Sequence, residues 1–215
     1  MSNHCQTIDF LQSGVGITPK LLERGAAHLR NADMAPKRRR GPSQPDFTTS
    51  AVVDLLTGGL LAPSNSKVVE TVRVLRTQHT TSVTFNPLSP DAPPLGRVRA
   101  AFDSVHMLGI HFLDRHTPGS MLDRVVDAMR NGTFAQWSKS DDDVIVELYP
   151  APLGAIIYFD RHEIHESAVF GFDVDKFAPP PPVQNVIRVR GSVLRGLATA
   201  LGPPPLVPAI PPPPY

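Results

Sequence analysis

Apolar residues at helical spacing predict one strong helix over residues 120–131. Its apolar positions share one continuous face, formed by Met121, Leu122, Val125, Val126 and Met129. Ser120 is expected to cap the first turn, with Asp123 three residues on, and Gly132 is expected to end the helix. The residues expected to face water are Asp123, Arg124, Asp127 and Arg130. An apolar face this wide should cover a sheet.

Weaker helical patterns occur toward both ends of the chain. Thr18 and Pro19 are residue types that begin helices, and they precede an apolar stripe formed by Leu21, Leu22, Ala26 and Leu29. A short capped helix is expected over 49–56, and Gly58-Gly59 should break it. A last helix is expected over 192–201.

The first group of predicted strands lies before the strong helix. Val68, Val72 and Val74 indicate a strand whose antiparallel neighbour runs over 80–85. A loop with several prolines follows, and 98–102 and 105–113 then predict one long strand or two.

The second group of predicted strands begins after the charged turn at 141–143. Residues 144–149 and 153–159 are joined by Pro150-Ala151-Pro152 and predict a hairpin-like pair. A further strand is expected over 164–172, and 186–189 should pair at a sheet edge.

These elements predict an α+β fold, with a β-rich core of about six to eight mostly antiparallel strands and a few packed helices. We expect an N-terminal arm over 1–46, a globular domain over 47–201 and a proline-rich tail over 202–215. Prolines at 203–205, 208 and 211–214 cannot donate ladder or helix hydrogen bonds, so the tail should be disordered or extended.

Composition and charge narrow the range of binding partners and cellular compartments that we expect for the protein. The net charge of the 215 residues is +1, so any attraction to membrane or nucleic acid must come from a local patch. Cys5 is the only cysteine, in an N-terminus expected to be mobile, which fits a reducing compartment. No run approaches the ~18 apolar residues of a membrane span, and no secretory signal is evident. We expect a cytosolic or nuclear protein, or one on the cytosolic side of a membrane.

One dense basic run, Lys37-Arg38-Arg39-Arg40, lies between Pro36 and Gly41-Pro42. The flanking residues predict an exposed linker. Four adjacent cations fit a nuclear import signal, a phosphate contact or an anionic-lipid contact, and a solvated linker is the alternative. Met34, just upstream, is a candidate second start.

The chain ends in Pro212-Pro213-Pro214-Tyr215, preceded by Pro211. Consecutive prolines form a stiff extended helix that loses little entropy on docking to aromatic grooves. The Pro-Pro-x-Tyr pattern resembles the late-domain motif of viral matrix and Gag proteins. That resemblance implies that a host WW-domain ubiquitin ligase binds these four residues during budding. A proline-rich tail without a specific partner is the alternative.

A second pattern is an apolar segment closed by Asp-Arg, Leu108-Gly109-Ile110-His111-Phe112-Leu113-Asp114-Arg115. It resembles the central strand of plant-virus movement proteins of the 30K superfamily. That resemblance implies a nucleic-acid-binding movement protein. The alternative is an ordinary strand that ends in a turn.

The motifs and residue spacings that mark catalytic, metal and cofactor sites predict neither an enzyme nor a cofactor. His162 and His165 are three residues apart, so on a strand they face opposite sides, unlike the paired histidines of a zinc-binding helix. We therefore expect no metal site. No phosphate-loop, dinucleotide or nucleophile-elbow motif occurs, and Cys5 lies in a poor place for a nucleophile.

The sequence thus favours a viral matrix-like assembly protein that self-associates. In this hypothesis the basic run contacts anionic membrane or nucleic acid, and Tyr215 with its prolines recruits the WW-domain ligase. Its expected places are the cytoplasm, the inner face of the host membrane and the virion. The rivals are a nucleic-acid-binding movement or capsid-type protein and an accessory adaptor with a WW-binding tail.

Overall fold

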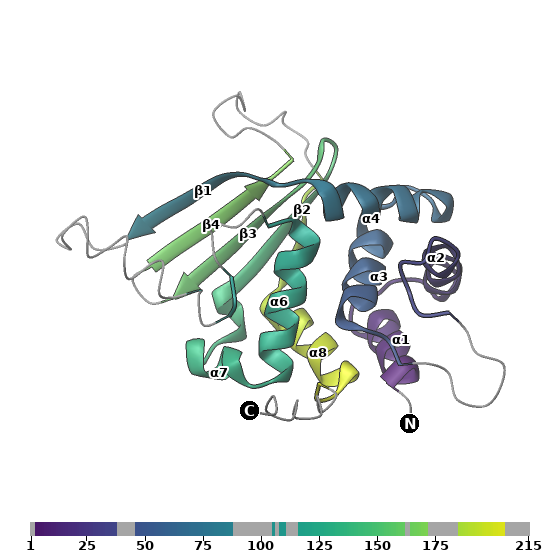
Figure 1. The fold of residues 1–215 in the computed structure, drawn as a ribbon, viewed down its shortest axis with the longest axis horizontal. Coiled ribbons are helices and arrows are strands. Elements are labelled where there is room, and N and C mark those ends of the chain that lie inside the picture. The colour runs from purple at the N-terminus through teal and green to yellow at the C-terminus, as the bar shows by residue number, and fades with distance from the viewer. Residues whose placement is uncertain are drawn as a thin grey trace, which may run out of the picture.

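An antiparallel sheet forms one layer of the protein, and helices pack against one of its faces (Figure 1). This computed structural model describes residues 3–37, 46–87, 105, 108–110, 116–161, 164–171 and 185–204. Five strands lie in the order β1-β4-β3-β2-β5, with bounds β1 Thr80–Pro87, β2 Val144–Pro150, β3 Leu153–Arg161, β4 Ile164–Phe170 and β5 Ile187–Arg190. The α+β prediction is confirmed, although the described strands are fewer than the expected six to eight.

The helices lie at different distances from the sheet. Helices α6, α7 and α8 lie next to it, α3 and α4 also contact strands β2 and β3, and α1 and α2 lie further away (Figure 1). Their bounds are α1 Asn3–Ser13, α2 Pro19–Asn31, α3 Thr49–Leu61, α4 Val68–Thr77, α6 Pro118–Arg130, α7 Thr133–Trp137 and α8 Gly191–Leu201.

Strict alternation gives the sheet two different faces. Along β2, Val144, Val146 and Leu148 are at most 1% exposed, and they point with the inner residues of β3 toward the helices. The intervening residues form the outer face, which includes Ile145 and Tyr149 and is half-buried for the most part. The predicted hairpin of β2 and β3 is confirmed, and so is the edge position of β5 beside β2.

Helix α6 carries the predicted apolar face, but its cap differs from the expectation. Thr117, and not Ser120, is the N-cap residue. The Thr117 hydroxyl accepts from the Ser120 backbone N–H at 3.1 Å, and the Thr117 backbone N–H donates to the Ser120 hydroxyl at 2.9 Å. Pro118 fits the first helical position because its missing N–H would have no partner there.

The strand predicted from Val68 to Val74 is wrong, because these residues belong to α4. Val68, Thr71, Val72 and Leu75 are buried at helical spacing, so tertiary burial overrides the β-preference of valine. As a result, β1 pairs with β4 instead of the predicted neighbour.

Helix α3 continues through Gly58-Gly59, where a break was expected. A Cβ on Gly58 would lie 2.9 Å from a Val68 methyl carbon, and one on Gly59 would lie 2.9 Å from Ile17. The two glycines therefore allow close packing of neighbouring segments, and that packing offsets their low helix propensity.

The N-terminal segment, assigned to an arm from the sequence, contributes to the core. Cys5 lies in α1, and Leu11, Leu22 and Leu29 are fully buried within the hydrophobic core. The predicted helix after Thr18 is confirmed as α2, although the Thr18 side chain makes no cap hydrogen bond. Of the helices that the structure describes, none has the length and apolar character needed to cross a bilayer.

The strand expected over 105–113 is wrong where the structure describes it. Residues 108–109 form a turn in which the Leu108 backbone N–H donates to Val105 at 2.9 Å, and Gly109 has a left-handed φ of 72°. The 30K-like central strand is therefore not formed at 108–110. Residues 111–115 and the predicted strand at 98–102 lie outside the described residues.

The junction between β5 and α8 contains no loop. Arg190 ends the strand and Gly191 begins the helix, which confirms the predicted last helix. A Cβ on Gly191 would lie 1.7 Å from the Asp141 carbonyl oxygen, so only glycine fits at this close approach.

Candidate functional site

Of the residues assigned to the basic run and to WW-domain docking, the structure describes only Lys37. Its Nζ lies 2.8 Å from Asp33 Oδ1, and both side chains are exposed. The hydrogen bond with Asp33 raises the pKa of Lys37, so the amine is charged at neutral pH. Arg38, Arg39 and Arg40 of the basic run lie outside the described residues, as do Pro212, Pro213, Pro214 and Tyr215.

Helix α2 extends the basic run in a way that the sequence did not reveal. Leu22, Gly25, Ala26 and Leu29 are buried on one side of α2. On the other side, Lys20, Arg24 and His28 are exposed at intervals of four residues. Residues four apart lie one above another on a helix, so these three form a stripe that we call the α2 stripe.

The histidines do not assemble a metal centre among the described residues, where no group of three or more suitable ligands occurs. His116 is buried, and its carbonyl oxygen accepts from the Thr80 backbone N–H at 3.1 Å and from the Thr80 hydroxyl at 3.2 Å. His116 therefore helps to join the start of α6 to β1. His111 and His162 lie outside the described residues.

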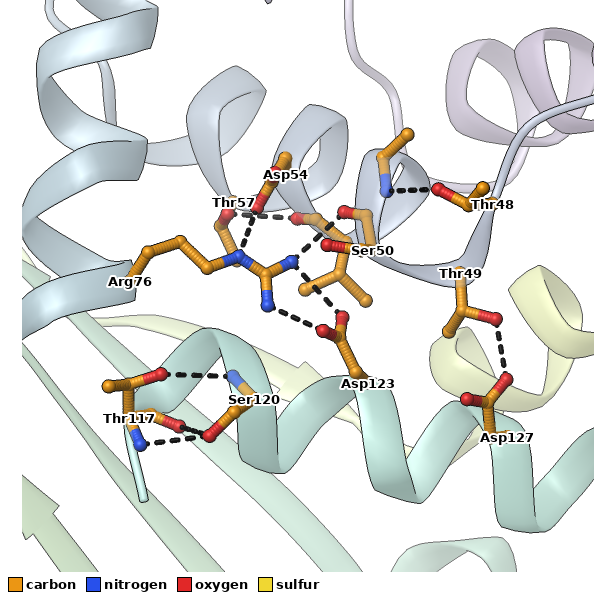
Figure 2. A network of polar contacts seen from close by, with 12 residues as sticks. Thr48, Thr49, Ser50, Asp54, Thr57, Arg76, Thr117, Ser120, Asp123 and Asp127 are labelled. Carbon is orange, nitrogen blue, oxygen red and sulfur yellow. Dashed lines mark hydrogen bonds and ion pairs between the residues drawn. The ribbon is translucent and has the colours of Figure 1, made fainter. Parts of the chain in front are cut away.

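Arg76 of α4 lies between two carboxylates that belong to different helices (Figure 2). Its Nε donates to Asp54 Oδ1 on α3 at 2.7 Å, and its Nη1 donates to Asp123 Oδ2 on α6 at 2.5 Å. Its Nη2 donates to the Ser50 carbonyl at 3.0 Å and to Asp123 Oδ1 at 3.1 Å. The guanidinium thus joins three helices through one planar group, which we call the Arg76 cluster.

The surroundings of Arg76 explain how it reaches both partners. A Cβ on Gly119 would lie 2.7 Å from Arg76 Cδ, so the first turn of α6 leaves space for the side chain. Asp54 is 3% exposed, and desolvation raises its pKa to about 6 despite the opposing charge of Arg76. Desolvation also raises the pKa of Asp123. Burial is thus the main cause of both shifts, and the repulsion from a neighbouring carboxylate adds to each of them.

A second polar contact continues along α6. Thr49 donates from its hydroxyl to Asp127 Oδ1 at 2.5 Å and accepts from Arg130 Nη1 at 2.8 Å. Arg130 also donates from Nε to the Gly202 carbonyl at 2.9 Å and from Nη2 to the Pro203 carbonyl at 3.2 Å. Arg130 therefore holds the residues that follow α8. The expectation that Asp123 and Arg130 face water is wrong, since their side chains are only 22% and 8% exposed.

The outer face of the sheet carries a different cluster, centred on Glu147 of β2. Glu147 Oε2 accepts from the Tyr149 hydroxyl at 2.9 Å and from the Tyr158 hydroxyl at 3.1 Å. Its other oxygen accepts from both Nε and Nη2 of Arg188, with an Nε distance of 3.1 Å. Partial burial raises the pKa of Tyr158 to about 12 and also raises that of Tyr149. Both tyrosines therefore keep their protons and act as donors.

Glu166 of β4 is a buried acid whose charge is not compensated by a hydrogen bond or ion pair in the described part of the chain. It is 2% exposed, on the same side of the strand as Ala168 and Phe170, and neither of its carboxylate oxygens has a hydrogen-bond partner there. Desolvation raises its pKa to about 8. The group is therefore mostly protonated at neutral pH, which lowers the cost of its burial.

These clusters escaped sequence reasoning for a simple reason. Arg76 and Asp54 are 22 residues apart, and Glu147 and Arg188 are 41 residues apart. No spacing rule along one element joins such residues. Only the alternation in β2 indicated part of one cluster, because it places Glu147 on the outer face of the sheet, between buried Val146 and Leu148.

Comparison with known proteins gives no relative to guide an assignment. No family model matches the chain, and no curated protein or solved structure is significantly similar to it.

Replacing Arg76 by alanine should destabilise the protein strongly. Removing one partner of a buried ion pair typically costs about 3–5 kcal/mol, because the remaining carboxylates have no compensating charge. Urea unfolding of Arg76→Ala should show this loss. Arg73→Ala, an exposed change on the same helix, is the matched control. Equal midpoints for both variants would contradict the central role of Arg76.

Replacing Glu166 by glutamine should remove a pH dependence of stability. The folded pKa of about 8 lies above the ordinary glutamate pKa of 4.5, so the contribution to stability is full below pH 4.5 and is lost as the pH rises through 8. The loss by neutral pH is about 3 kcal/mol at most. Chemical unfolding between about pH 5 and pH 8 should therefore give a falling stability that Glu166→Gln flattens. Exposed Glu70→Gln should leave the slope unchanged, and a wild-type slope in Glu166→Gln would contradict the prediction.

Proposed function

We propose that this chain is a non-enzymatic viral assembly protein of the matrix type. In this proposal it works in the cytoplasm at the inner face of the host membrane and in the virion. It contacts an anionic surface through the α2 stripe and the basic run, self-associates, and recruits a host WW-domain ubiquitin ligase through Pro212-Pro213-Pro214-Tyr215. The observation that carries the proposal is the α2 stripe, which leads along the chain into Lys37 and the three arginines.

The stripe supports the proposal because its charges are held on a rigid element. Leu22 and Leu29 fix α2 in the core, so Lys20 and Arg24 project from a helix whose orientation is set. Cations near an anionic membrane contribute about 1 kcal/mol each. Glu23 and the Asp33–Lys37 pair reduce the local positive charge, so the arginines of the basic run must add to the stripe.

The tail supports the recruiting part of the proposal. The chain following Pro203 contains no charged side chain and is rich in proline, which suits a ligand that docks as a preformed extended helix. Arg130 holds the carbonyls of Gly202 and Pro203, so the tail starts from a fixed point.

Reversing the charge of the α2 stripe should weaken binding to anionic vesicles. Lys20→Glu with Arg24→Glu removes two cations and adds two anions. The lost cations alone, at about 1 kcal/mol each, lower the affinity about 30-fold, so the loss should be at least that large. Co-sedimentation with phosphatidylserine vesicles measures it, and neutral phosphatidylcholine vesicles give the background. Arg73→Glu on α4 is the matched control, because it changes an exposed cation outside the stripe.

The same variants separate membrane binding from nucleic-acid binding. If vesicles do not bind, but single-stranded RNA binds with an affinity that falls steeply with salt, the nucleic-acid rival replaces the membrane proposal. Vesicle binding that is equal in the stripe variant and the control would contradict the role of α2.

Tyr215→Ala should abolish binding to a WW domain and lower particle release. The tyrosine is the specific side chain of the Pro-Pro-x-Tyr pattern, so its loss should leave only weak proline contacts. Titration against an isolated WW domain measures the binding, and counting of released particles measures the second effect. Pro208→Ala, in the same tail but outside the motif, is the control. Unchanged binding and release in Tyr215→Ala would contradict recruitment through this motif.

A further inference from the structure

We infer that the outer face of the sheet is a docking surface for the chain's own proline-rich tail, residues 205–215. The surface, which we call the tyrosine face, comprises Ile145, Glu147, Tyr149, Ile156, Tyr158 and Arg188. The inference concerns the tail used in the proposed function and rests on that proposal only for its biological role. Docking on the sheet can be tested separately from WW binding.

The tyrosine face is ordered before any ligand arrives. Both tyrosine hydroxyls donate to the same oxygen of Glu147, at 2.9 Å and 3.1 Å, so the two rings are held from their polar ends. Tyr149 lies opposite Gly154 in the sheet register, so no side chain competes with its ring from the neighbouring strand. Aromatic rings held in this way suit proline-rich ligands, because little side-chain entropy is lost on docking.

The charges of the tyrosine face are compensated within it. Arg188 binds one oxygen of Glu147 through two donors, and the tyrosines bind the other oxygen. This bonding, together with the charge of Arg188, lowers the pKa of Glu147 despite its partial burial, so the carboxylate stays ionised beside its cation. A neutral ligand therefore leaves the Glu147–Arg188 pair undisturbed, although Arg190 lies exposed on the same face, opposite Ile145. Ile145, Ile156 and both rings remain half-buried and present apolar surface.

The tail has the matching chemistry. From Pro203 to Tyr215 it contains prolines, Leu206, Val207, Ala209 and Ile210, with no charged side chain. An acidic peptide or a nucleic acid carries several charges, and of the two arginines on this face Arg188 is already paired with Glu147, which leaves Arg190. The apolar tail, which has no charged side chain, is therefore the occupant that we assign to the surface.

The tail is long enough to reach the face of its own sheet. Helix α8 begins at Gly191, directly after Arg190, which is paired with Ile145 of the tyrosine face. The 11 residues of α8 carry the chain about 16 Å away at ~1.5 Å per residue. If residues 205–210 cross that distance at about 3.1 Å per residue, or about 19 Å in all, residues 211–215 remain for the face. We assign the docking to a single molecule, and the mixed sample described below tests this assignment against a second copy.

Docking on the sheet would regulate the tail. A WW domain and the tyrosine face would compete for the same prolines, so docking lowers the apparent affinity for the WW domain by the fraction of tails that are undocked. If about nine-tenths of the tails are docked, that reduction is about tenfold.

Paramagnetic relaxation in the full-length protein tests the docking directly. A nitroxide is placed at Pro208→Cys in a Cys5→Ser background, and the backbone amides are observed by NMR. The expected result is broadening of Ile145, Ile156 and Tyr158 beyond that of α2, and its loss in Tyr149→Ala with Tyr158→Ala. Uniform broadening, or broadening centred elsewhere, would overturn the inference. If the double alanine variant does not fold, Tyr149→Phe with Tyr158→Phe replaces it and should reduce the broadening, because the rings lose their bond to Glu147.

A mixed sample decides which molecule supplies the tail. Spin-labelled, isotopically unlabelled protein is combined with isotope-labelled protein that carries no spin label. Broadening of the tyrosine face in this sample would overturn the intramolecular assignment in favour of a second copy. If the tyrosine face is not broadened in the mixed sample, but is broadened when the same molecule carries both the spin label and the isotope label, the docking occurs within one molecule.

The affinity for a WW domain provides the link to the proposed function. Tyr149→Ala with Tyr158→Ala should strengthen WW binding by up to about tenfold, whereas Arg73→Ala should leave it unchanged. If broadening is observed but no WW domain binds, the proposed recruitment fails and the docking stands. If a WW domain binds the wild type and the tyrosine variants equally, and no broadening occurs, the docking fails and recruitment stands.

Discussion

The arrangement of the helices depends on one guanidinium group. Arg76 joins α3, α4 and α6 through Asp54, Asp123 and the Ser50 carbonyl, in a place where each carboxylate is largely removed from water. Apolar packing alone tolerates sliding between helices, but a planar group with donors in fixed directions does not. The Arg76 cluster therefore sets how α3 and α4 lie against α6, and α6 in turn lies against the sheet (Figure 1).

The sheet divides the molecule into two chemically different parts. Its inner face is covered by helices and carries Glu166, a buried acid with no hydrogen-bond partner among the residues that the structure describes. Its outer face carries a fully bonded carboxylate, two fixed tyrosines and an exposed arginine. Burial without partners raises one acid's pKa, whereas hydrogen bonds and a cation lower the other's. The same residue type thus has opposite behaviour on the two faces.

Elements with strong local patterns could be predicted from the sequence. The apolar face of α6, the alternation of β2 and β3, and the helix after β5 all follow from residues close together in the chain. Helix α4 could not be predicted correctly, because its valines favour strands and only burial against α3 and α2 decides otherwise. The Arg76 cluster and the tyrosine face could not be predicted at all, since their members come from separate helices and strands.

Because no loop separates β5 from α8, the last helix continues directly from the edge strand of the sheet. Gly191 lies against the Asp141 backbone, and the far end of α8 is held by Arg130 at Gly202. A change in the direction of β5 would therefore change the direction of α8 as well, because no loop between them can absorb it.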